Sequence, residues 1–213
     1  MRQTIKLFLF FLIGVVLLSC ESEYSKTVKR ELKTGIVHED LVLGLKLGQT
    51  QKEFYNHCWQ LNKQKVISAG SGNRFAKHTM LLDSTAQNAE KVDMLFYGIF
   101  DQDQVMHGVH LIFSYVKWAP WNKEYHPPVL LKALQQKYLK EYQGNPFIEI
   151  TIKDDVKAYV KVDGNREILM YPSTDKDVTV KIQDLRFKVN GSRVNQQEEK
   201  KVAQKDSTLG LKE

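Results

Sequence analysis

Regular alternation of apolar and polar residues in the second half of the chain limits the fold more than any other feature. Apolar residues occupy every second position over 148–152 and again over 156–162. Successive side chains of a strand point to opposite faces, so this pattern predicts strands with one buried and one solvated face, which favours antiparallel pairing. Asp163-Gly164 predicts a tight turn into a strand at 167–171, and 178–182 gives the last strand.

The first half also contains segments rich in aromatic and β-branched residues. They predict strands at 75–82, 91–100 and 105–117, with a hairpin loop at 101–104 between the last two. Residues that share one face of the third strand should point into the core. They are Val105, Val109, Leu111, Phe113 and Tyr115.

Two helices precede these groups of strands. Thr50 and Glu53 form a capping box, which predicts a helix whose buried stripe includes Phe54, Cys58 and Leu61. Pro127-Pro128 opens a second helix, and Gly144-Asn145-Pro146 ends it. The stripe of the second helix consists of Leu131, Leu134, Tyr138 and Tyr142.

This order predicts an α+β fold with both helices on one face of an antiparallel sheet and the other face open. We expect one domain at 41–187 in two α/β halves, 41–125 with a helix then three strands and 126–187 with a helix then four strands. Residues 20–40 are predicted to be a polar tether, and 188–213 a mobile polar tail.

The N-terminus has the pattern of a secretory signal peptide at 1–19. Arg2 and Lys6 precede an uncharged apolar run of 12 residues at 7–18, and polar residues follow from Glu21. The alternative is a transmembrane anchor, but a spanning helix needs about 20 apolar residues. The run is therefore better explained as a cleaved signal.

The end of this segment, Leu17-Leu18-Ser19-Cys20, resembles the lipobox of bacterial lipoproteins. The resemblance implies a diacylglyceryl group on Cys20, a mature chain that starts there, and attachment to a membrane of the bacterial cell envelope. We expect the outer membrane, with the domain facing the periplasm or the cell surface. Several acyl chains, palmitate among them, would hold the protein on the bilayer.

Two further resemblances concern the domain. The arrangement of two α/β halves resembles β-lactamase-inhibitor-protein-like domains. The segment 47–53 is similar to the Gly-Met-Thr helix opening of small outer-membrane-assembly lipoproteins (SmpA/OmlA type), with Gln49 in place of the Met. Both resemblances imply a protein-binding habit rather than an enzymatic activity.

Charge and cysteine content exclude several classes of function. Residues 1–19 contain two basic and no acidic residues, so the net charge of +6 becomes +4 after cleavage. The charges are interspersed, whereas nucleic-acid-binding proteins concentrate basic residues on one face, so we predict no nucleic-acid partner. Only Cys58 remains beside Cys20, so no internal disulfide is expected in the mature chain, and we predict an inert core thiol.

No catalytic or cofactor-binding motif is present, and we predict no cofactor. Neighbouring helical residues diverge, so His57 is not expected to act as a base for Cys58. His107 and His110 are three apart on a predicted strand and should face opposite sides, which argues against a metal site.

The link between the halves holds two of the three tryptophans. We predict a contact surface for a protein or a glycan there, against the alternative that Trp118 and Trp121 only pack the crossover onto the sheet. The candidate residues are Tyr115, Lys117, Trp118, Trp121, Lys123 and Tyr125.

Taken together, the sequence predicts a lipid-anchored, non-catalytic envelope protein that binds another macromolecule through its sheet face or through this aromatic crossover. The alternatives left open are a small-ligand or glycan-binding module with a Trp/Tyr-lined pocket, and a hydrolase whose catalytic groups converge from distant segments.

Overall fold

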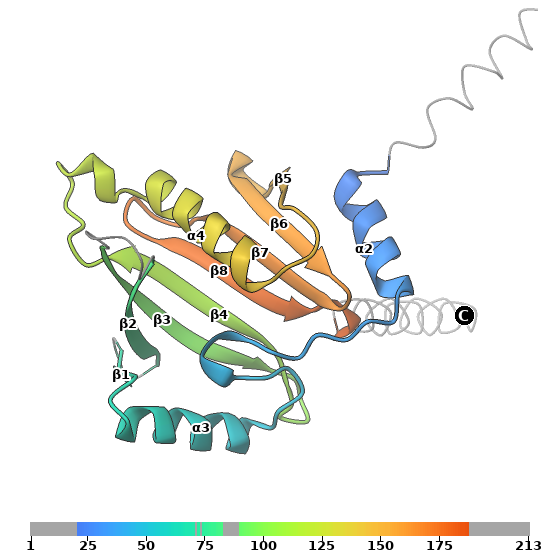
Figure 1. The fold of residues 1–213 in the computed structure, drawn as a ribbon, viewed down its shortest axis with the longest axis horizontal. Helices are drawn as coiled ribbons and strands as arrows, with labels where there is room; N and C mark the ends of the chain where they lie inside the picture. The colour runs from blue at the N-terminus through green and yellow to red at the C-terminus, as the bar shows by residue number, and fades with distance from the viewer. Residues whose placement is uncertain (1–20, 71, 73, 83–89, 188–213) are drawn as a thin grey trace, which may run out of the picture.

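The computed structural model describes residues 21–70, 72, 74–82 and 90–187, and its described strands form one antiparallel sheet flanked by helices (Figure 1). The helices are α2 (Glu23–Lys33), α3 (Gln51–Lys63) and α4 (Pro127–Glu141), with short 3₁₀ turns η1 (Val42–Gly44), η3 (Lys123–Tyr125) and η4 (Lys153–Asp155). The strands are β1 (Ser68–Ala69), β2 (Ala76–Leu81), β3 (Lys91–Phe100), β4 (Met106–Tyr115), β5 (Ile148–Thr151), β6 (Lys157–Asp163), β7 (Arg166–Pro172) and β8 (Val178–Asp184). The signal peptide predicted at 1–19, Cys20 and the tail predicted at 188–213 lie outside the described residues.

The strand order is β1-β2-β3-β4-β8-β7-β6-β5, with every pair antiparallel. β4 and β8 therefore meet at the centre, where Leu111 pairs with Val180. Each half consists of a helix followed by four strands, and in both halves the chain runs from the edge of the sheet to its centre. The predicted α+β class with an antiparallel sheet is confirmed, and the two-residue β1 gives the first half one strand more than we predicted.

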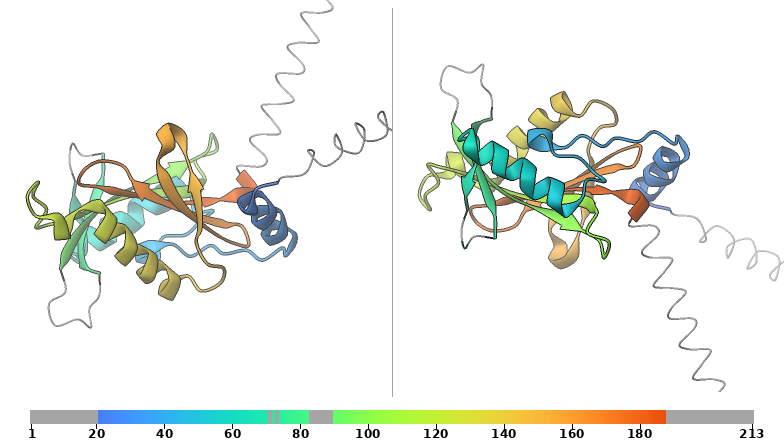
Figure 2. Two further views of the ribbon diagram at one scale, coloured as in Figure 1. Left: turned by 90° about the horizontal axis from the view of Figure 1, so that it is seen from above. Right: turned by 90° about the horizontal axis from the view of Figure 1, so that it is seen from below.

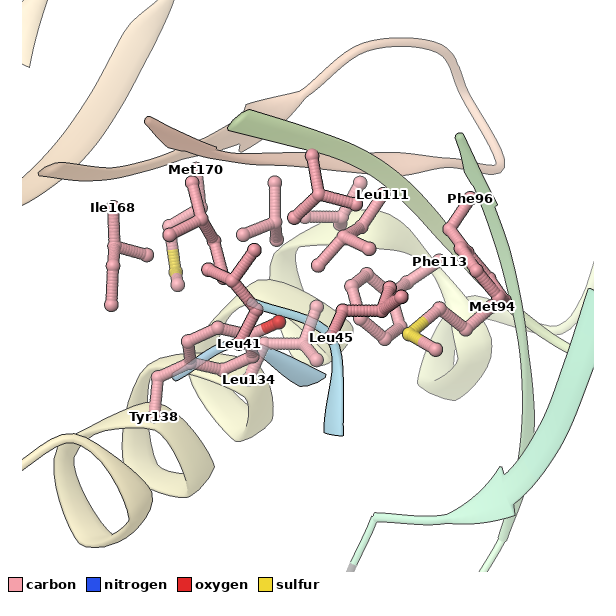
Figure 3. Close-up of a cluster of buried hydrophobic side chains, with 14 of the residues drawn as sticks. Leu41, Leu45, Met94, Phe96, Leu111, Phe113, Leu134, Tyr138, Ile168 and Met170 are labelled. Carbon is pink, nitrogen blue, oxygen red and sulfur yellow. The ribbon is translucent and has the colours of Figure 1, made fainter. Parts of the chain in front are cut away.

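Helices α3 and α4 cover one face of the sheet, as predicted. α3 begins with the capping box, in which the Glu53 N–H lies 3.3 Å from Thr50 Oγ1 and the Thr50 N–H lies 2.7 Å from Glu53 Oε2. Phe54 from α3 and Leu134 from α4 join the same buried cluster as Leu111 of β4. Figure 3 shows this cluster from the side of α4, with Leu134 and Tyr138 beneath the sheet residues.

The tether predicted at 20–40 is corrected by the structure, because part of it folds onto the domain. Ser22 caps α2, whose Tyr24, Val28 and Leu32 pack on Val160 and Val162 of β6. These β6 residues alternate with those on the α4 side, so α2 covers the opposite face of the sheet at its β5–β6 end. α2 lies at one end of the molecule (Figure 2).

The predicted wet face of β6 is also corrected. Lys161 is fully buried, and its Nζ lies 2.8 Å from Asp163 Oδ2. Lys161 also donates to the carbonyl of Asn145, in the segment that follows α4. The alternation in the sequence was therefore a true strand signal, but α4 and its C-terminal loop bury the polar side as well.

Candidate functional site: the uncovered sheet face and the pocket beside α4

The face of β2, β3, β4 and β8 that points away from α3 and α4 carries no helix among the described elements (Figure 2). The strand registers align its side chains in cross-strand rows. One row joins Tyr97, His110 and Lys181, and the next joins Leu95, Ile112 and Thr179. Aromatic and apolar side chains thus lie at the centre of this surface, which we call the uncovered face.

Tyr97 and His110 form the central pair of the uncovered face. The Tyr97 hydroxyl lies 2.6 Å from His110 Nδ1, the rings are 4.9 Å apart, and Phe75 packs edge-on against Tyr97 at 5.4 Å. Partial burial and the nearby positive charge of Lys181 lower the pKa of His110. The Nδ1 atom of a neutral imidazole can accept a hydrogen bond from the Tyr97 hydroxyl, so the pair is held together in its uncharged form.

Charged groups border this aromatic centre toward β2. Lys77 Nζ lies 2.7 Å from Asp93 Oδ2, and the Thr79 hydroxyl donates to the same carboxylate over 2.6 Å. Burial alone would raise the pKa of Asp93, but the hydrogen bonds from Lys77 and Thr79 outweigh it and lower the pKa. The uncovered face therefore combines an apolar centre with an ionised margin, as protein-binding surfaces do.

A pocket of about 490 Å³ lies on the other side of the sheet, between α4, η1 and β2. Its walls are largely apolar, with Met94 and Phe113 buried at the sheet. Polar side chains lie at the margin of the pocket. Among them, Lys137 and Glu141 form an ion pair at 2.6 Å. The remaining lining residues are Asp40, Leu41, Val42, Leu43, His78, Met80, Leu81, Tyr138 and Tyr142.

Two of the residues that line this pocket, Tyr138 and His78, have polar side-chain atoms whose hydrogen bonding can be described. The Tyr138 hydroxyl is buried and has no hydrogen-bond partner within the described part of the chain. In Figure 3 its oxygen points toward Leu41 and Leu45, in the segment that carries η1. His78 Nδ1 lies 2.7 Å from the Val66 carbonyl oxygen, which holds this nitrogen as the donor and leaves Nε2 as an acceptor in the neutral ring.

The crossover residues predicted to form a binding surface separate into two groups. Tyr115 is buried, and its ring packs edge-on against Tyr125 at 5.3 Å. Lys117 Nζ and the Tyr125 hydroxyl both contact Glu90 Oε1, at 3.0 and 3.1 Å. These contacts hold the crossover against Glu90, which directly precedes β3.

The two tryptophans differ in environment. Trp118 is half-buried against the core, and its Nε1 donates to the Asp175 carbonyl over 3.1 Å. Trp121 is 85 % exposed, and Lys123 beside it is exposed too. The packing interpretation therefore describes Trp118, whereas Trp121 is available for contact.

The thiol and the imidazoles do not converge. Cys58 is half-buried, and burial raises the pKa of its thiol to about 11, so the thiol stays protonated near neutral pH. His57 Nε2 lies 2.8 Å from the Leu43 carbonyl oxygen, and the His107 ring stacks on Phe187. Among the described residues, no three His, Cys, Asp or Glu side chains are grouped so that they could hold a metal ion.

Comparison with protein-family models, with curated proteins and with solved structures found no match to this chain. The family resemblances stated above therefore stay predictions. Within the described ranges, no helix is long and apolar enough to cross a bilayer.

Proposed function

We propose that this protein is a lipid-anchored, non-catalytic component of the bacterial cell envelope that binds another envelope macromolecule through the uncovered face. The observation that carries the proposal is the aromatic and apolar surface of β3, β4 and β8, which no described helix covers. Its centre contains Tyr97, His110 and Ile112. A broad surface of this composition suits a macromolecule better than a small ligand.

The fold of α2 supports the anchoring part of the proposal. Ser22, the N-cap of α2, lies two positions after Cys20, and α2 itself packs on β5 and β6. An acyl group on Cys20 would consequently be joined almost directly to the folded domain. The domain would sit at the bilayer surface, within reach of partners in or near the membrane.

Anchoring is tested by metabolic labelling with palmitate in a bacterial host. We expect label on the intact protein and none on Cys20→Ala. Equal labelling of the two proteins, or none on either, would remove the lipid anchor from the proposal while leaving the binding surface untouched.

Binding is tested by site-specific photo-crosslinking in intact cells. A photoreactive residue at Tyr97 should give a discrete adduct of higher mass, because Tyr97 lies at the centre of the uncovered face. Leu139 on α4 is the matched control, since it is 42 % exposed against 36 % for Tyr97. The same adducts from both positions, or none from Tyr97, would argue against this face.

A second candidate function is the binding of a small amphipathic ligand in the pocket beside α4. The observation that favours it is the largely apolar wall of this pocket with the Lys137–Glu141 ion pair at its margin, because an apolar cavity with a few polar groups at its edge suits a molecule that has both apolar and polar parts. Titration with envelope lipids and glycans, followed by tryptophan fluorescence, should then give a saturable change. The change should be lost in Met80→Lys, which places a charge in the pocket, and kept in Trp121→Ala.

A further inference from the structure

The exposed side of α2 carries four cations in one stripe. Lys26, Lys29, Arg30 and Lys33 follow the spacing that places side chains on one helix face. Lys26 and Lys33 are exposed, and the side chains of Lys29 and Arg30 are 68 % and 60 % exposed. The opposite side of the helix, with Thr27, Val28 and Leu32, faces the sheet.

This stripe is fixed to the domain rather than carried on a loose segment. Glu31 Oε2 accepts the Gly164 N–H over 3.1 Å, and Arg30 Nη2 donates to Asn145 Oδ1 over 3.2 Å. These hydrogen bonds join α2 to two loops beside β6, in addition to the packing of Val28 and Leu32 on the sheet. The cations of α2 thus have a set direction relative to the sheet.

The four cations line an open groove of about 470 Å³, together with Glu21 and Thr34. The acidic residues near the groove are few. Glu21 pairs with Lys29 at 2.5 Å, and Glu31 is engaged with Gly164 and Arg30. Glu23 is exposed in the first turn of the helix. Lys26 and Lys33 have no ion pair with any described residue, so the groove keeps an excess of positive charge.

We propose that the cationic stripe of α2 binds the anionic headgroups of the bilayer that holds the acyl chains of Cys20, and so sets the orientation of the domain on the membrane. The inference rests on the proposed acylation for its place at the bilayer, because Cys20 precedes the α2 N-cap by two positions. Basic residues beside a lipid anchor strengthen attachment to anionic membranes. With α2 against the bilayer, β1 and β2 would lie at the far end of the molecule (Figure 1).

The test uses the chain from residue 20 with Cys20→Ser, which contains every described element and has no acyl chain. Its binding to phosphatidylcholine vesicles with and without phosphatidylglycerol is measured by co-sedimentation. We expect binding only when phosphatidylglycerol is present, and weaker binding at high ionic strength. Lys26→Gln with Lys33→Gln should weaken it on the order of 20-fold, since each basic residue near an anionic surface contributes about a fivefold change.

The matched control is Lys132→Gln with Lys140→Gln, which removes two exposed charges from α4. Circular dichroism checks that all variants are folded. Equal loss of binding in the two double variants would show that net charge, not α2, is responsible, and would overturn the inference, as would binding to neutral vesicles alone. Because no acyl chain is present, this result is independent of whether Cys20 is modified in cells.

Discussion

His110 on the uncovered face should make the stability of the protein depend on pH. Partial burial and the charge of Lys181 lower its pKa. The unfolded chain then takes up a proton at higher pH than the folded protein, so acid favours unfolding. We expect the free energy of unfolding to be unaffected by this residue above about pH 7 and to fall as the pH drops through about 6.5.

Urea unfolding of the protein and of His110→Gln measures this effect. The variant should lose less stability than the unaltered chain between neutral and mildly acidic pH. The same acid dependence in both proteins would contradict the assignment to His110.

The buried ion pair of Lys161 and Asp163 makes a second prediction at the scale of single residues. Asp163 also accepts the Asn145 N–H, and Arg166 Nη2 lies 3.9 Å away, so the carboxylate is the shared partner of two buried cations. Asp163→Ala should destabilise the fold by about 3–5 kcal/mol, because it leaves both cations unpaired. Lys161→Met should cost less, since Asp163 keeps Arg166 and Asn145. Chemical denaturation ranks the two, and the reverse order would argue against a shared carboxylate.

At the scale of elements, the packing of α2 on the sheet can be tested by a single substitution in α2. Val28→Asp places a charge between α2 and β6, and should lower the free energy of unfolding by about 1–3 kcal/mol. The freed helix should also be cut by chymotrypsin faster than in the unaltered protein. Lys26→Asp, on the exposed side, is the control and should change neither property. A polar tether would give no effect for Val28→Asp, so that outcome would contradict the packed helix.

The elements that could be predicted are those with local signals. The capping box of Thr50 and Glu53 locates α3, and the prolines at 127–128 locate α4. α2 was missed because its apolar stripe is short and is stabilised by distant residues of β5 and β6. Continuing the register in which Phe100 pairs with Met106 would pair Tyr97 with Val109, but an irregularity between Ile99 and Phe100 moves the register by one residue, so that Tyr97 meets His110. Such shifts leave no clear mark in the sequence, and the candidate site depends on one.

On the scale of the whole molecule, the two halves share one core and should unfold together. Phe54 of the first half and Leu134 of the second belong to the same buried cluster, and six residue pairs join β4 to β8. Phe54→Ala and Leu134→Ala should each destabilise by about 2–5 kcal/mol and keep a single transition. Tryptophan fluorescence and far-ultraviolet circular dichroism should give coincident curves. Separate midpoints for the two probes would mean that the halves are independent.

The strand order also has a consequence for the borders of the sheet. Because each half runs from the edge of the sheet to its centre, the first and shortest strand of each half forms a margin, with two residues in β1 and four in β5. Such brief margins offer few unpaired backbone groups to a neighbouring chain. Molecules crowded side by side in two dimensions would therefore resist joining strand to strand into fibrils, and could stay separate at high local density.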